Sequence, residues 1–231
     1  YYKNGKLKEE VYNKNGELEG PAKFYYETGE LEWEGMYNYG VMQGSWKEFY
    51  KNGKIMTESK CKDNAIGSTI KLYYESGELE AEGVCINDKL EGITKEYYKN
   101  GKVKEVRYMK NNLMVGVLKL FYESGALRYI YNVKDNRVNG TSKEFYETGE
   151  LKIKGYFKND NPIGVQKAYF KNGNLKLKFN FANGKPQGAA STYYENGYIQ
   201  NEISYNNGKK ISRKSYNMAG QLKMDSTVSA Q

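Results

Sequence analysis

The sequence predicts an all-β protein, an elongated antiparallel meander of about nine 24-residue β-hairpin repeats that forms a twisted, single-sheet, solenoid-like ribbon. A glycine that recurs every 24 residues without insertion or deletion is the signature of a repeat array. Aromatic residues make up 15% of the chain, including 24 tyrosines, which suits a sheet with water on at least one face. The recurring glycines are Gly5, Gly29, Gly53, Gly77, Gly101, Gly125, Gly149, Gly173 and Gly197.

One copy shows how each repeat is built. Residues 45–50 are rich in aromatic and strand-forming residues, and Asn52-Gly53 follows them. An Asn-Gly pair between two such runs predicts a two-residue type I′ hairpin turn. A second strand is expected from about Lys54 to Cys61, followed by a looser connection at residues 63–67, which contains turn residues. Copies with Thr-Gly or Ser-Gly are weaker formers of this turn, so another turn type is open there.

The register follows from a two-residue loop. It places Phe24 opposite Trp33 and Tyr26 opposite Leu31 on the more apolar side of the sheet, here called the first face. The opposite side, the second face, is expected to carry Lys–Glu pairs in early copies and Lys–Lys pairs in later ones. These pairs are Lys23–Glu34, Lys47–Glu58, Lys71–Glu82, Lys143–Lys154 and Lys167–Lys178.

The domain organisation follows from the period. We expect residues 1–224 to form a single tandem array, with a final irregular copy at about 205–224 as a cap and a tail at 225–231. The period slips by one residue at Gly220, and a terminal repeat must cover an exposed strand edge. The chain opens at Tyr1-Tyr2, the end of a repeat strand, so we expect it to be cut from a longer protein.

The repeat motif carries a family resemblance. The pattern Tyr-Tyr-x-x-Gly-x-Leu-x-x-x-Gly-x-Tyr at residues 25–37, followed by a spaced Gly-x-x-Lys-x-Phe-Tyr, resembles the MORN (membrane occupation and recognition nexus) repeat. It is more narrowly similar to the second MORN variant, found in tandem in bacterial proteins, some labelled as antitoxins of toxin–antitoxin pairs. The resemblance covers nearly the whole chain and implies a string of β-hairpins that acts as a scaffold or interaction surface. The common period of the family is slightly shorter than 24 residues.

The sequence argues against an enzyme. It contains no histidine, which removes His-dependent nucleophile activation, His metal ligands and the usual general base. Related repeats lie beside the kinase domain of plant phosphatidylinositol-phosphate kinases, but this chain has no nucleotide-binding loop or catalytic Asp motif. A lipid-kinase label would rest on the repeats alone. We therefore expect no catalysis, no cofactor, no metal and no small-molecule substrate.

A non-catalytic scaffold that mediates protein–protein interaction is the predicted function. Residues that occur in every copy are expected to serve the fold, so specificity is expected from nonperiodic aromatic rings. The candidate partner-binding residues are Trp33, Trp46, Tyr129 and Tyr131. The identity of the partner does not follow from the sequence.

Charge supports an alternative function. Residues 152–231 carry 13 Lys and Arg against 4 Asp and Glu, a net charge of +9. The alternative is peripheral binding of anionic membrane lipid through this basic C-terminal third, and nucleic acid is not expected as a partner. The compartment stays open between the cytoplasm and export from a bacterial cell. The candidate anion-binding residues are Lys209, Lys210, Arg213 and Lys214.

Overall fold

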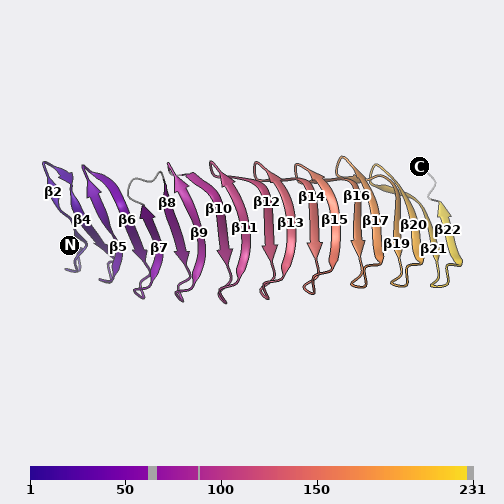
Figure 1. Ribbon diagram of the computed structural model, residues 1–231, viewed down its shortest axis with the longest axis horizontal. Helices are drawn as coiled ribbons and strands as arrows, with labels where there is room; N and C mark the ends of the chain where they lie inside the picture. Colours follow the sequence, from indigo (N-terminus) through magenta and orange to yellow (C-terminus); the bar gives the residue numbers. More distant parts are fainter. Residues whose placement is uncertain (62–66, 88, 228–231) are drawn as a thin grey trace. The chain divides into compact units, whose positions relative to one another are not determined.

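The computed structural model describes residues 1–61, 67–87 and 89–227, and this part of the chain consists of β-strands joined by turns (Figure 1). Consecutive strands pair in antiparallel fashion, which confirms the predicted all-β meander of hairpin repeats. By their contacts the residues form two compact units, Tyr1–Leu113 and Met114–Gln231. Each unit is described below by itself.

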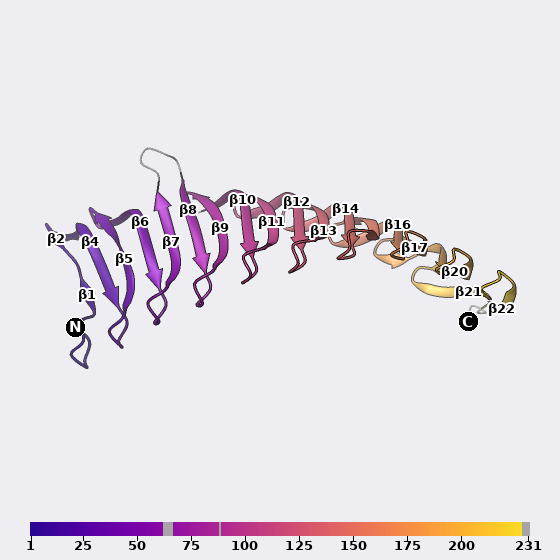
Figure 2. The same ribbon diagram turned by 60° about the horizontal axis from the view of Figure 1, so that its bottom comes forward.

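In the first unit the strands follow one another in chain order from β4 onward (Figure 2). Before them, β1 pairs with β4, and β2 and β3 form a separate two-stranded hairpin. The strands are β1 (Glu9–Glu10), β2 (Asn13–Lys14), β3 (Glu17–Leu18), β4 (Gly20–Tyr25), β5 (Leu31–Asn38), β6 (Val41–Phe49), β7 (Ile55–Cys61), β8 (Ser68–Tyr73), β9 (Leu79–Ile86), β10 (Lys89–Tyr97) and β11 (Val103–Lys110).

The second unit continues the same hairpin pattern. Its last described strand, β22, is exposed along its whole length. The strands are β12 (Leu113–Phe121), β13 (Leu127–Lys134), β14 (Arg137–Phe145), β15 (Leu151–Lys158), β16 (Asn161–Tyr169), β17 (Leu175–Ala182), β18 (Lys185–Pro186), β19 (Gly188–Tyr193), β20 (Ile199–Asn206), β21 (Lys209–Tyr216) and β22 (Leu222–Thr227).

The turns within the hairpins differ from the predicted type I′. At Gly53, the backbone N–H donates to the carbonyl of Tyr50 (2.9 Å), and the Tyr50 N–H donates to the carbonyl of Lys54 (2.8 Å). Gly53 has a φ of +80°, whereas Asn52 is not among the residues with positive φ. This geometry is a three-residue loop, a type I turn closed by a glycine bulge. The prediction of a two-residue loop was therefore wrong.

The longer loop changes the register next to the turn. Tyr25, rather than Tyr26, lies opposite Leu31, whereas Phe24 lies opposite Trp33 as predicted. The bulge absorbs the extra residue, so the pairs farther from the turn keep the predicted faces.

The asparagine of the Asn-Gly pair forms hydrogen bonds with the backbone through its side chain. The Asn52 Oδ1 accepts a hydrogen bond from the backbone N–H of Lys54 (2.9 Å), and its Nδ2 donates to the carbonyl of Glu75 in the next copy (3.0 Å). Asparagine is favoured in such positions because its short amide bonds to nearby backbone. Asn52 thus closes its own turn and links it to the next copy.

The connections between hairpins are tight in most described copies. Asn159 and Asp160 have φ values of +47° and +66°, and the flanking residues Lys158 and Asn161 pair directly. Positive φ at both central residues defines a type I′ turn. The connections expected to be looser are therefore the two-residue turns.

Several of these turns bond to the start of the strand that follows the preceding connection. The Asp160 N–H donates to the carbonyl of Val138 (3.0 Å), and the Asp160 Oδ1 accepts from the Val138 N–H (2.7 Å). Asn112 makes the same two bonds to Leu90, and Asn136 makes them to Met114.

A glycine bulge near the start of the first strand of a hairpin keeps the register. Met36 pairs with Gln43 and Glu34 pairs with Lys47, so three residues, 44–46, lie opposite Gly35. β6 thus has two residues more than β5 at this point. Because two is an even number, side chains beyond the bulge keep the same faces of the sheet. In the last copy, Ser204 pairs with Ser212 and Tyr205 with Lys210, so only one residue is added there. The one-residue slip of the period lies in this shortened bulge.

A ladder of tyrosines joins neighbouring copies. The hydroxyl of Tyr50 donates to the carbonyl of Tyr73 (2.7 Å), and that of Tyr146 donates to the carbonyl of Tyr169 (2.9 Å). Phe170 occupies the same repeat position and has no hydroxyl, so it leaves one rung out. The other rungs described are made by Tyr2, Tyr26, Tyr74, Tyr122 and Tyr194.

We expect Tyr146→Phe to lower the free energy of unfolding by about 1 kcal/mol, because the carbonyl of Tyr169 loses its donor. The reverse change, Phe170→Tyr, is expected to raise it by up to about 1 kcal/mol by adding the absent rung to Tyr193. Urea unfolding of the two variants beside the original chain measures both values. A loss of stability in Phe170→Tyr would contradict the ladder.

Candidate interaction surfaces

The first face of the first unit carries an aromatic cluster around Trp33. The Trp33 ring packs against Phe24 on the neighbouring strand, with ring centroids 5.6 Å apart, and against Tyr37 at 5.9 Å. All three rings are half-buried. A hollow of about 400 Å³ lies beside them and is also lined by two methionines, Met42 and Met56, and by two glutamates, Glu32 and Glu48. The cluster therefore offers aromatic rings that water reaches, with carboxylates beside them.

The structure brings Trp46 close to this cluster. Trp46 on β6 lies opposite Ser59, which is almost fully buried. A methyl group added at Gly35 would lie 2.4 Å from the ring of Trp33 and 3.1 Å from the Cβ of Trp46. The two tryptophans thus approach each other over Gly35, which has no side chain to separate them.

Tyr129 and Tyr131 form a second aromatic cluster, on β13 in the second unit. Their rings are stacked with centroids 5.3 Å apart, and the guanidinium carbon of Arg128 lies 4.9 Å from the centroid of Tyr129. Burial, together with Tyr129 and the carboxylate of Glu144, raises the pKa of Tyr131 to about 12. Tyr131 therefore stays protonated at neutral pH and can donate a hydrogen bond.

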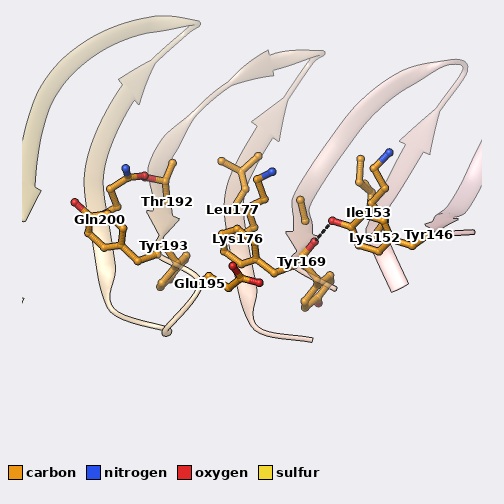
Figure 3. Close-up of a pocket in the computed structure, with 13 residues that line it drawn as sticks. Tyr146, Lys152, Ile153, Tyr169, Lys176, Leu177, Thr192, Tyr193, Glu195 and Gln200 are labelled. Carbon is orange, nitrogen blue, oxygen red and sulfur yellow. Dashed lines mark hydrogen bonds between the residues drawn. The ribbon is translucent and has the colours of Figure 1, made fainter. Parts of the chain in front are cut away.

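Sequence reasoning missed a cavity of about 470 Å³ in the second unit (Figure 3). The Lys152, Ile153, Lys176 and Leu177 side chains line it (Figure 3). Phe170, where the tyrosine ladder lacks a rung, also lines it. This departure from tyrosine was the sequence signal that could have located the cavity.

The four predicted anion-binding residues do not share one face. Lys209 and Lys210 are exposed at the start of β21. The Arg213 Nε and Nη2 donate to the Oδ1 of Asn201 (3.0 and 2.8 Å). Lys214 points to the other side of the strand and forms an ion pair with Asp225 (3.5 Å). Anion binding by these residues stays a prediction.

On the second face of the first unit, lysines alternate with glutamates across the strands. Lys95 lies 3.4 Å from a carboxylate oxygen of Glu82, which also accepts a hydrogen bond from the Tyr97 hydroxyl (2.6 Å). These contacts lower the pKa of Glu82, with the Tyr97 hydrogen bond as the largest cause. Burial and the same hydrogen bond raise the pKa of Tyr97 to about 12. The predicted Lys–Glu pairs Lys23–Glu34, Lys47–Glu58 and Lys71–Glu82 are all confirmed in register.

Within the residues that the structure describes, no group of three or more His, Cys, Asp or Glu side chains is placed to hold a metal ion. In the same residues, no helix has the length and apolar character needed to span a membrane.

The repeat geometry agrees with a comparison of the sequence with family models. The model of the MORN repeat variant matches seven segments, which together cover more than half of the chain: residues 18–39, 42–60, 90–111, 114–135, 138–159, 162–183 and 186–207. The chain belongs to the MORN repeat family. MORN repeats are generally parts of scaffolds for protein or membrane interaction, and the repeat itself is non-catalytic.

Comparisons with whole proteins give no further information about the function of this MORN chain. No curated protein matches its sequence. It is similar to the crystal structure of TcdB2-TccC3-Cdc42, at 10% identity and a TM-score of 0.23, over 95% of this chain and 15% of that chain. It is also similar to a structure of the Photorhabdus luminescens Tc holotoxin pore, at 12% identity and a TM-score of 0.20, over 95% and 15% of the two chains. Likeness at this level carries no argument about function.

Proposed function

We propose that this MORN repeat chain is a non-catalytic scaffold that binds another protein through the aromatic clusters of its first face. The observation that carries the proposal is that the fold does not require these rings. The position of Trp33 is held by Thr57 and Ala81 in the next two copies, and the position of Tyr131 is held by Ser59 and Gly155 in other copies.

Large rings at such positions leave apolar surface in contact with water, and a bound partner removes that unfavourable contact. A half-exposed tryptophan or tyrosine keeps apolar area in water, and aromatic residues are enriched among the residues that dominate binding energy. The stacked pair at Tyr129 and Tyr131 adds rigid area with few side-chain torsions to order on binding. Each cluster is therefore a candidate anchor for a protein partner.

The test is capture of partners from the soluble fraction of the source organism, first with the original chain and then with Trp33→Ala and Tyr131→Ser. Other copies carry these replacement residues, so the fold is expected to accept them. We expect a partner bound through either cluster to bind at least about tenfold more weakly to the matching variant. Tyr108→Thr is the control, because this exposed tyrosine lies on the second face of the first unit. Equal binding to all three variants would refute the proposal.

Binding to an anionic membrane surface is the second candidate. It is supported by the net charge of residues 152–231 and by the exposure of Lys209 and Lys210. Binding to vesicles that contain phosphatidylglycerol would then fall steeply between low and moderate salt, and with Lys209→Glu and Lys210→Glu combined. Vesicle binding unaffected by this double change would exclude the basic C-terminal third as a lipid site.

A further inference from the structure

In the second unit the second face carries an uninterrupted row of lysines. Lys143 pairs with Lys154, Lys154 with Lys167, and Lys167 with Lys178, so four lysines lie side by side on β14, β15, β16 and β17. We call these four residues the lysine row. Adjacent strands lie about 4.8 Å apart, so four positive charges fall within about 14 Å.

The row is unfavourable for the isolated chain. Like charges directly opposite each other on neighbouring strands destabilise a sheet. At the same positions of the first unit, Glu34, Glu58 and Glu82 separate the lysines. In the described residues, no acidic side chain forms an ion pair with any lysine of the row. In the first unit, alternating lysines and glutamates thus cancel each other's charge at these positions. In the second unit the four lysines have no such glutamates between them.

The chemistry that is lost is that of a carboxylate. In the first unit, Glu58 accepts a hydrogen bond from Tyr73 (2.7 Å), and Glu82 accepts one from Tyr97 (2.6 Å), each 15 residues further along the chain. The tyrosines at the corresponding positions of the second unit are Tyr169 and Tyr193, and 15 residues before them stand Lys154 and Lys178. These positions of the second unit therefore carry lysine ammonium and tyrosine hydroxyl groups, which donate hydrogen bonds. They lack the glutamate carboxylate that accepts such bonds in the first unit.

We propose that the lysine row binds an acidic polypeptide segment of the partner, whose Asp and Glu side chains supply the missing carboxylates. The proposal rests on the proposed function and adds a second contact of the same protein partner. The row lies on the face opposite the aromatic clusters, so the acidic segment is a part of the partner separate from the part that covers those clusters. An extended chain rises about 3.3 Å per residue, so the row spans about four or five residues of such a segment. Lys143, Lys154 and Lys178 are exposed and Lys167 is half-buried, so their ammonium groups are accessible to it.

The test uses the full chain and fluorescein-labelled hexaglutamate, with binding followed by fluorescence anisotropy at low ionic strength. Lys154→Glu places a carboxylate between Lys143 and Lys167 and so restores the alternation of lysine and glutamate that the first unit shows. We expect it to weaken hexaglutamate binding at least about tenfold and to raise the unfolding midpoint by about 1–3 °C. Opposite effects on binding and on stability are what a functional row predicts.

The matched control is Lys158→Glu, which makes the same charge change on the same strand, four residues or about 13 Å away. Equal weakening by the two variants would reduce the effect to net charge and overturn the proposal. The proposal would also be overturned if hexaglutamate did not bind while oligodeoxythymidylate or phosphatidylglycerol vesicles bound and Lys154→Glu weakened that binding. If hexaglutamate does not bind while a captured partner still depends on Trp33 or Tyr131, this proposal fails and the proposed function stands.

Discussion

Asp160→Val is expected to lower the free energy of unfolding by about 2–4 kcal/mol. Asp160 has a φ of +66°, a left-handed conformation that is costly for a β-branched side chain. The change also removes the Oδ1 that accepts from the backbone N–H of Val138, the bond that attaches this turn to the start of β14. Urea unfolding followed by circular dichroism measures the loss.

Other copies provide the controls for this prediction. Asn112 and Asn136 hold the same turn position with the same bond, so Asp160→Asn is expected to change the stability by less than about 0.5 kcal/mol. Asp160→Gly removes only the side-chain bond, and a loss of about 1 kcal/mol is expected. A valine variant as stable as the asparagine variant would show that neither the turn nor its bond matters.

Gly35→Val is expected to destabilise the first unit by about 2–3 kcal/mol through overpacking. The φ of Gly35 lies outside the left-handed region, so the cost is steric. A Cβ at this position would lie 2.4 Å from the Trp33 ring, which is held by Phe24 and Tyr37. The chain has two tryptophans, and both border this glycine, so a change in tryptophan fluorescence should accompany the loss of stability.

Gly83 is the natural control because it holds the same repeat position in the same unit. A Cβ there would meet the Thr94 Oγ1 at 3.2 Å and other atoms no nearer than 3.5 Å, so Gly83→Ala is expected to cost less than about 1 kcal/mol. If Gly83→Ala and Gly35→Ala cost the same, the tryptophan rings would not be the cause.

The strands and the pairing in the middle of each hairpin could be predicted from the sequence. Phe24 with Trp33 and Lys23 with Glu34 follow from the alternation of apolar and polar residues, which fixes the register. The turn types could not be predicted, because the rule for Asn-Gly assumes that asparagine adopts positive φ. Asn52 instead uses its amide to bond Lys54 and Glu75, a contact with the next copy that local statistics do not contain.

The candidate site was predictable only in part, for the same reason. Lys143–Lys154 and Lys167–Lys178 lie within hairpins and were predicted, whereas Lys154–Lys167 joins two hairpins. That pair depends on the turn at Asn159 and Asp160, which the sequence suggested to be loose. The aromatic clusters were recognised because Trp33 and Tyr131 break the repeat, but their neighbours depend on strand pairing and side-chain geometry.

The tyrosine ladder has a consequence for how the chain folds. Each described rung joins residues 22 or 23 positions apart, so the loop that must close to form it has nearly the same length in each copy that has one. The entropy lost on closing a loop depends on that length, and an added copy does not increase it. Most all-β proteins fold slowly because distant strands must meet. Here we expect order to spread from any formed hairpin to its neighbour, so that the folding rate depends on the step between copies and not on the length of the array.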